Sequence, residues 1–203
     1  MKRTLKKFQD FKNSLNFNFI ELKKTDDGIF FGNVCLEKST GEKIFEGENF
    51  INISFKSRTS IAKILSNLFP YSFKFKGKKV ASIEGVLQAI KYKDKKTQNL
   101  VLKYSGLDAY HTRGCNNYDF WGNTGLLYWQ GKEIKRNSKE YQTFLDELYL
   151  SALKNLLYKR ALISSGNKYL IHHIGRDNIN ETVLTRYEYE SRLYYIREFL
   201  KVG

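Results

Sequence analysis

The residues best suited to chemistry are a glutamate and a lysine that one helix would carry two turns apart. Glu84 falls in the first turn of a helix predicted to begin after Ser82, whose side chain suits an N-cap. The free N–H groups of a first turn favour the ionised form of a carboxylate by roughly 0.3–1 kcal/mol. A carboxylate must be ionised to act as a general base or to stabilise a cationic intermediate. Lys91 lies on about the same face and could bind a phosphate as a point charge. The alternatives are a glutamate that only stabilises the helix and a lysine that is only solvated.

The elements around this helix change in character along the chain. Residues 1–12 are a basic amphipathic start that suits a short helix, and residues 17–55 show the alternation and turn residues of a small β meander. Residues 73–76 alternate with period two and predict a strand that ends in a turn at Gly77. Residues 105–137 are rich in glycine, asparagine and aromatic side chains, and we expect an irregular segment that faces a ligand.

Two further helices are predicted in the C-terminal half. A long helix begins at the N-cap Asn137 and ends before Gly166, and the last helix begins at a capping box formed by Thr185 and Glu188. Their apolar stripes consist of Tyr141, Phe144, Leu145, Leu148, Ala152 and Leu156 in the long helix, and of Tyr189, Leu193, Ile196 and Leu200 in the last helix.

Together these elements predict an α+β fold that is mainly α, a compact helical core with a few short strands and an added N-terminal β region. We expect a basic leader and β meander over residues 1–58 and a catalytic domain over residues 59–203. With 41% apolar and 15% aromatic residues, the composition excludes a disordered chain. No apolar run reaches the ~18 residues of a membrane span, and the N-terminus lacks the apolar stretch of a secretory signal. The expected location is cytoplasmic, which means the host cytoplasm if a phage encodes the chain.

A large positive charge points to an anionic partner. The net charge is +14 at pH 7 and the pI is about 9.6, which attracts nucleic acid or phosphorylated small molecules. The alternative explanation is that the many lysines only reflect the base composition of the genome. The charge has a local maximum formed by Lys74, Lys76, Lys78, Lys79, Lys91, Lys93, Lys95, Lys96 and Lys103, opposed there only by Glu84 and Asp94.

Several common active-site motifs are missing from the sequence. It contains neither Gly-x-Gly-x-x-Gly nor Gly-x-x-x-x-Gly-Lys-Ser/Thr, the two common glycine-rich loops that bind phosphate. It also lacks the Gly-x-Ser-x-Gly motif that carries a nucleophilic serine. His111 and Cys115 stand four residues apart and His172 adjoins His173, but no second pair completes a zinc set, so we expect no metal and no cofactor. A nucleophilic Cys115 with His111 or His173 as its base is conceivable, although a lone cysteine is more often inert.

Two segments resemble the NADAR family, whose N-glycosidase members are called YbiA-like. Residues 66–70 (SNLFP) match its Ser-Asn-Phe-Tyr-Pro-like segment, and residues 82–85 (SIEG) match its Ser-Val-Glu-His-like helix start, which continues as Gln-Ala-x-Lys at residues 88–91. The resemblance extends over about residues 60–200. The chain departs from the family pattern at Gly85, where a histidine is usual, and lacks the Asp-x-x-Trp-Gly ending, as in a divergent branch.

The resemblance implies a compact, mostly helical fold and hydrolysis of a base–ribose N-glycosidic bond. The key family carboxylate falls on Glu84 and a second acidic position on Asp177, which makes these two the expected catalytic residues. The family tryptophan falls on Trp129, and the signature segment supplies Asn67 and Phe69. Family members remove ADP-ribose from guanine in nucleic acid or cleave phosphorylated riboflavin intermediates.

Elementary chemistry assigns the binding residues their expected roles. Trp129 can stack on the leaving base, with Trp121 as a weaker candidate and a core position as the alternative. Asn67 can hydrogen-bond a ribose or a base edge, or only hold the turn before Pro70. His173 can bind phosphate or help to protonate the leaving group near neutral pH.

Three functions remain open at this stage. The leading expectation is removal of ADP-ribose from guanine in nucleic acid, because a small phosphorylated substrate does not need such a basic surface. The second is a non-catalytic nucleic-acid-binding protein, for which lysines interleaved with aromatic residues would form a stacking platform. The third is an N-glycosidase of riboflavin-pathway intermediates. None of the three implies a membrane.

Overall fold

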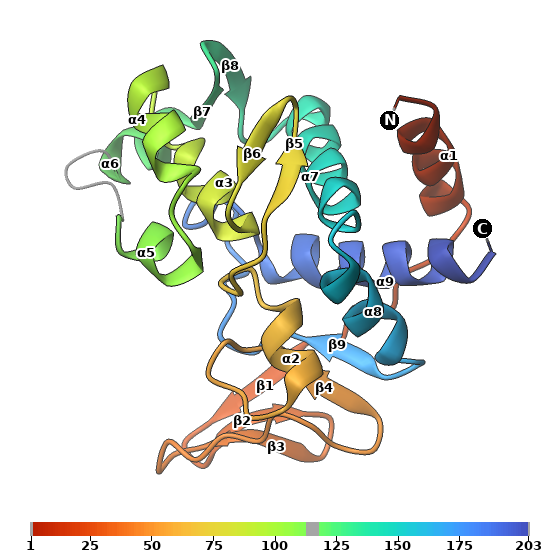
Figure 1. Cartoon of the computed structure of the whole chain (residues 1–203). Coiled ribbons are helices and arrows are strands. Elements are labelled where there is room, and N and C mark those ends of the chain that lie inside the picture. Colours follow the sequence, from red (N-terminus) through yellow and green to blue (C-terminus); the bar gives the residue numbers. More distant parts are fainter. Residues whose placement is uncertain (1, 113–117, 203) are drawn as a thin grey trace. The chain divides into compact units, whose positions relative to one another are not determined.

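The computed structural model describes residues 2–112 and 118–202, without the side chains of residues 118–120 (Figure 1). Cys115, the conceivable nucleophile, lies outside the described residues. The chain folds into two compact units that interleave along the sequence. Unit 1 comprises Met1–Ser66, Arg160–Gly175 and Arg186–Gly203, and unit 2 comprises Asn67–Lys159 and Arg176–Thr185.

Unit 1 joins the N-terminal region to the C-terminal helix. Its elements are α1 (Lys2–Asn13), β1 (Leu22–Thr25), β2 (Gly28–Phe31), β3 (Val34–Lys38), β4 (Phe50–Asn52), α2 (Ser60–Leu65), β9 (Tyr169–Ile171) and α9 (Arg186–Val202). The amphipathic start forms α1 as predicted, and its Phe8 packs edge-on against Phe199 of α9 at 5.6 Å between ring centroids. The last helix also forms where it was predicted, directly after Thr185.

The predicted meander is smaller than the sequence indicated. The strands β1, β2 and β3 form an antiparallel sheet in which a β-carbon at Gly28 would lie 2.1 Å from the Glu37 carbonyl oxygen, so the turn requires glycine (Figure 1). Residues 17–21 are not a strand, because Phe17 and its neighbours pack their rings on α9. The strand β4 leaves the meander and pairs in parallel with β9.

Unit 2 consists of short helices and two antiparallel hairpins. Its elements are β5 (Phe73–Phe75), β6 (Lys78–Val80), α3 (Ile83–Ala89), α4 (Lys95–Val101), α5 (Gly106–His111), α6 (Tyr118–Thr124), β7 (Leu126–Trp129), β8 (Lys132–Lys135) and α7 (Lys139–Ala152). The strand predicted at residues 73–76 is confirmed as β5, and Gly77 makes the turn with φ 83°. The segment 105–137, expected to be irregular, instead forms two helices and the β7–β8 hairpin within its described residues.

The long C-terminal helix was predicted one residue too early and too long. Ser138, not Asn137, is the N-cap of α7, because its Oγ accepts the Tyr141 N–H at 3.1 Å. The helix ends at Ala152, and α8 (Leu156–Ser164) begins anew after Asn155, whose Oδ1 accepts the N–H groups of Leu157 and Tyr158. A side chain that caps a new helix therefore interrupts the apolar stripe.

Candidate active site

The helix α3 holds Glu84 at its start by two contacts. Ser82 is the N-cap, as predicted, with its Oγ accepting the Gly85 N–H at 2.9 Å. The backbone N–H of Glu84 donates to the carbonyl oxygen of Asn67 at 3.0 Å, which fixes the entry to the helix against the preceding segment. The side chain of Glu84 is half-buried in the first turn, where the helix dipole favours a negative charge.

A buried hydrogen-bonded series connects Glu84 to Lys91 through Gln88. The Gln88 Nε2 donates to the Glu84 Oε1 at 2.6 Å, and the Gln88 Oε1 accepts from the Lys91 Nζ at 2.8 Å. Gln88 and Lys91 are both buried. Because the ammonium pulls electron density from the amide, the series polarises the Gln88 N–H toward the carboxylate. We name Lys91, Gln88 and Glu84 the carboxylate series.

Asn67 is fixed from a second direction by α7. The buried hydroxyl of Tyr149 donates to the Asn67 Oδ1 at 2.9 Å. A β-carbon at Gly106 would lie 1.8 Å from the Leu68 carbonyl oxygen, so only glycine lets α5 approach this segment so closely. Phe69, partly exposed, stacks on Tyr71 with ring centroids 6.1 Å apart. The structure thus brings together Asn67, Glu84 and Lys91 among the sequence-predicted residues.

The departure at Gly85 has a steric counterpart in unit 2. A β-carbon there would lie 3.3 Å from both the Ser82 Oγ and the Tyr104 carbonyl oxygen. Both distances are shorter than an ordinary van der Waals contact. A side chain at position 85 would therefore require its neighbours to shift by a few tenths of an ångström.

The other candidates of unit 2 are two buried tryptophans and one exposed aspartate. Trp129 is only 8% exposed and packs against Phe75 and Phe144 at centroid distances of 5.1 and 5.5 Å, which is the core position weighed for it above. Asp177 is exposed, on the segment of unit 2 between β9 and α9. Trp121, the weaker stacking candidate, is buried in α6.

His173 belongs to unit 1, where both ring nitrogens are engaged. Its Nδ1 lies 2.8 Å from the Asn52 Oδ1 and its Nε2 lies 2.6 Å from the Glu37 Oε2. Burial lowers the pKa of His173, although the hydrogen bond to Glu37 acts in the opposite direction. In unit 1 the imidazole therefore connects β4 to β3.

Sequence reasoning did not select Gln88 or Tyr149 as site residues. Gln88 had a usable signal, because a glutamine on the helix face between Glu84 and Lys91 is within hydrogen-bonding reach of both. Tyr149 had none, since its partner Asn67 is distant in sequence.

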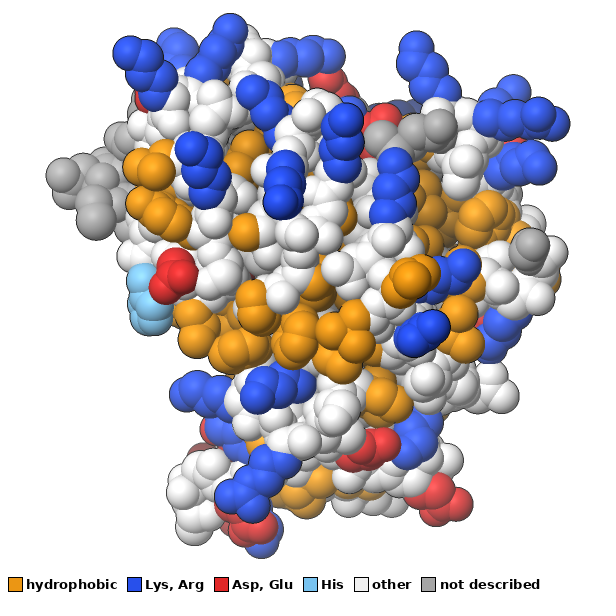
Figure 2. Space-filling model, viewed as in Figure 1, with side chains coloured by type: hydrophobic (Ala, Val, Ile, Leu, Met, Phe, Trp, Pro, Cys, Tyr) orange, Lys and Arg blue, Asp and Glu red, His pale blue; other side chains and the backbone are white. Residues whose placement is uncertain are grey.

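Exposed lysines gather over one side of unit 2. Figure 2 shows Lys and Arg side chains over the β5–β6 hairpin, α4 and the β7–β8 hairpin. We name this surface the lysine face, and its exposed members are Lys74, Lys76 and Lys79 on the β5–β6 hairpin, Lys93 just before α4, Lys95 and Lys96 in α4, and Lys132 and Lys135 on β8. The tertiary structure adds Lys132 and Lys135 to the cluster that the sequence indicated. Such a surface attracts a polyanion.

The described part of the chain contains neither a metal-binding group nor a membrane-spanning helix. Among the side chains of residues 2–112 and 121–202, no group of three or more His, Cys, Asp or Glu could hold a metal ion. Within the same residues no helix is both long and apolar enough to span a membrane.

Comparison with known proteins defines the class of fold as YbiA-like. The NMR structure of the E. coli protein YbiA is similar with a TM-score of 0.51, covering 77% of this chain and 88% of that chain at 17% identity. This likeness confirms the expected fold. The family model described as bacteriophage protein GP30.3 matches residues 59–198, and the chain belongs to that family. Among curated proteins, none matches the sequence.

Proposed function

We propose that the chain is an N-glycosidase that hydrolyses the base–ribose bond of an ADP-ribosylated or phosphoribosylated substrate, with ADP-ribosylated guanine in nucleic acid as the preferred one. The observation that carries the proposal is the carboxylate series, which holds Glu84 by a hydrogen bond from Gln88 next to Asn67. A half-buried carboxylate held on a short rigid helix is what the reaction needs.

The reaction passes through an oxocarbenium-like sugar. The C1′–N bond breaks with its electron pair moving to the base, and water attacks C1′. Glu84 stabilises the developing positive charge or accepts the proton of the attacking water, and a proton delivered to the base completes its departure. The products are free ADP-ribose and restored guanine. Gln88 and Lys91 act as positioning residues, since they act on the reacting atoms through Glu84.

The roles proposed for the other predicted residues differ in how much evidence supports them. We expect the base to stack on the partly exposed ring of Phe69, which would strengthen substrate binding by roughly 1–3 kcal/mol. Asn67 presents an amide to the ribose, and Asp177 is proposed as the second carboxylate on the strength of the resemblance alone. Trp129 supports the site from the core of unit 2. The role of His173 as a phosphate ligand stays a prediction from the sequence.

The lysine face supports a nucleic-acid substrate over a free nucleotide. Exposed lysines that neutralise phosphates contribute affinity independent of sequence, and that affinity falls steeply with salt. The same surface favours a second candidate function, a non-catalytic protein that only binds nucleic acid. A third candidate, cleavage of riboflavin intermediates, makes no use of this surface.

The deciding experiment compares wild type with Glu84→Gln and with a control, Asp108→Asn, for release of ADP-ribose from ADP-ribosylated guanine DNA. Asp108 is also an acidic residue in the first turn of a helix of unit 2, but on the exposed side of α5. We expect wild type and Asp108→Asn to release ADP-ribose and Glu84→Gln to be at least about 100-fold slower with DNA binding unchanged. Equal release by Glu84→Gln would exclude the role of Glu84.

A second measurement separates the three functions. Salt-dependent DNA binding without release by any of the proteins would favour the non-catalytic function. Release from a free phosphorylated nucleoside but not from DNA would favour the small-molecule substrate.

A further inference from the structure

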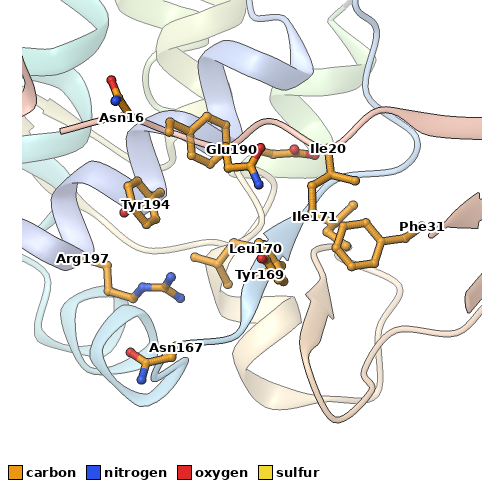
Figure 3. Close-up of a pocket in the computed structure, with 12 residues that line it drawn as sticks. Asn16, Ile20, Phe31, Asn167, Tyr169, Leu170, Ile171, Glu190, Tyr194 and Arg197 are labelled. Carbon is orange, nitrogen blue, oxygen red and sulfur yellow. The ribbon is translucent and has the colours of Figure 1, made fainter. Parts of the chain in front are cut away.

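Unit 1 contains a pocket that the proposed reaction does not use. The cavity has a volume of about 230 Å³ and lies between the segment at residues 16–20, β9 and α9 (Figure 3). Every residue that lines it belongs to unit 1. Part of its wall, including Phe17 and Phe31, comes from residues that the family match does not cover.

A buried arginine forms one polar end of the pocket. Arg197 is 4% exposed, its Nη1 donates to the Lys168 carbonyl oxygen at 2.7 Å and to the Ser165 Oγ at 3.1 Å, and its Nε donates to Glu198 at 3.3 Å. These bonds leave Nη2 without a hydrogen bond to any described residue. Figure 3 shows the guanidinium directed toward β9. Burial lowers the pKa of Arg197, so an anion would relieve a desolvated cation.

The charge near Arg197 stays positive after its neighbours are counted. Glu198 is shared between Arg197 and Lys201, whose Nζ lies 2.8 Å from the same oxygen. Two cations and one carboxylate therefore meet at this end. A phosphate can take two parallel N–H bonds from a guanidinium, which makes arginine the preferred ligand for it.

The other polar end carries a carboxylate that does not repel an anion. Glu190 lies two turns before Arg197 on α9, an axial separation of about 10 Å. The Glu190 Oε1 accepts the His172 N–H at 2.7 Å and lies 3.6 Å from the Arg186 Nε, so its charge is compensated. A carboxylate in this state accepts further N–H donors, such as those on the edge of a nucleobase.

Aromatic side chains line the space between these ends. Phe17 packs against Tyr194 and Phe31 against Tyr169, each pair at 5.4 Å between ring centroids. Rings of this kind stack on any planar base. We propose that the pocket binds a nucleoside monophosphate, with the phosphate on Arg197, the base among the aromatic side chains and its N–H groups toward Glu190.

The test uses the full chain and calorimetric titration with AMP and GMP, with adenosine as the uncharged comparison. We expect at least one mononucleotide to bind and adenosine to bind roughly tenfold or more weakly, because a hydrogen bond to a charged group is lost. Equal binding of adenosine and AMP, or no binding of either mononucleotide, would overturn the proposal.

Variants locate the binding in the pocket. Arg197→Lys should weaken AMP binding about tenfold or more, since a lysine cannot make the parallel bonds. Arg192→Lys is the matched control, a buried arginine of the same helix that does not line the pocket, and should bind normally. Tyr169→Leu, at a position that is 44% exposed, should also weaken binding. If neither Arg197→Lys nor Tyr169→Leu weakened binding, the site would lie elsewhere.

The pocket and the proposed reaction can fail independently. Glu84→Gln should bind AMP as wild type does, because Glu84 lies in unit 2. A loss of AMP binding in that variant would assign the nucleotide to the candidate active site and refute the inference.

Discussion

Replacing Gln88 by methionine should reduce turnover by more than it reduces the amount of folded protein. The change removes the bond that Gln88 donates to Glu84 at 2.6 Å and the bond that it accepts from Lys91 at 2.8 Å. Each is a hydrogen bond to a charged group and contributes about 1.5–3 kcal/mol, so with non-additivity we expect a loss of about 2–4 kcal/mol. For a chain of this size that lowers Tm by roughly 4–16 °C.

The kinetic effect separates a positioning role from a structural one. Without the Gln88 amide the carboxylate can leave its productive position, and misplacement by about 1 Å costs up to ~100-fold in rate. We expect kcat for ADP-ribose release to fall tenfold to a hundredfold per folded molecule. KM should be nearly unchanged, because Gln88 is not expected to touch the substrate.

Gln98→Met is the matched control for this substitution. Gln98 is also a buried glutamine of unit 2, and its Nε2 donates to the Tyr92 and Tyr128 carbonyl oxygens at 2.6 and 3.0 Å. Its loss should lower Tm comparably without changing kcat at a temperature where the protein is folded. The reasoning is refuted if Gln88→Met keeps the wild-type kcat, or if Gln98→Met loses as much.

Two further predictions concern stability. Burial lowers the pKa of His172 to about 4, so the folded state holds a neutral imidazole while the unfolded chain, with a pKa near 6.5, takes up a proton. The free energy of unfolding should therefore decrease as pH falls from 6.5 to 4, by at most about 3 kcal/mol for this half-buried group, and urea titrations should show a smaller decrease in His172→Gln. Gly106→Ala should lower Tm strongly, because its β-carbon would meet the Leu68 carbonyl oxygen at 1.8 Å, whereas Gly122→Ala, with its nearest neighbour at 4.0 Å, should not. Equal pH slopes for both proteins, or equal Tm changes for both alanine variants, would contradict these arguments.

Features of the fold with local causes could be predicted from the sequence. The Ser82 cap, the strand β5 with its turn at Gly77 and the last helix after Thr185 each depend on residues within a few positions of one another. Features with distant causes could not. The parallel pairing of β4 with β9 joins Phe50 to Tyr169, and no short-range pattern marks it.

The candidate site divides in the same way. The prediction that one helix carries both Glu84 and Lys91 is wrong, because α3 ends at Ala89, but Gln88 still joins the two residues by hydrogen bonds. The contact of Tyr149 with Asn67 depends on tertiary structure and left no trace in the sequence. For Trp129, composition cannot distinguish a stacking platform from a core side chain, and the Phe75 and Phe144 rings decide the packing.

Unit 1 is built from both ends of the sequence, so the experiments must use the full chain and not a fragment of it. A chain begun at residue 59, where the family match begins, would lose β4 from beside β9 and both hydrogen-bond partners of His173. It would also lose α1 from α9 and part of the pocket wall. Newly exposed apolar surface on α9 and β9 would then lower solubility and stability whether or not the first 58 residues contribute to catalysis. Inactivity of such a fragment would therefore say nothing about Glu84, whereas point variants of the full chain change one interaction at a time.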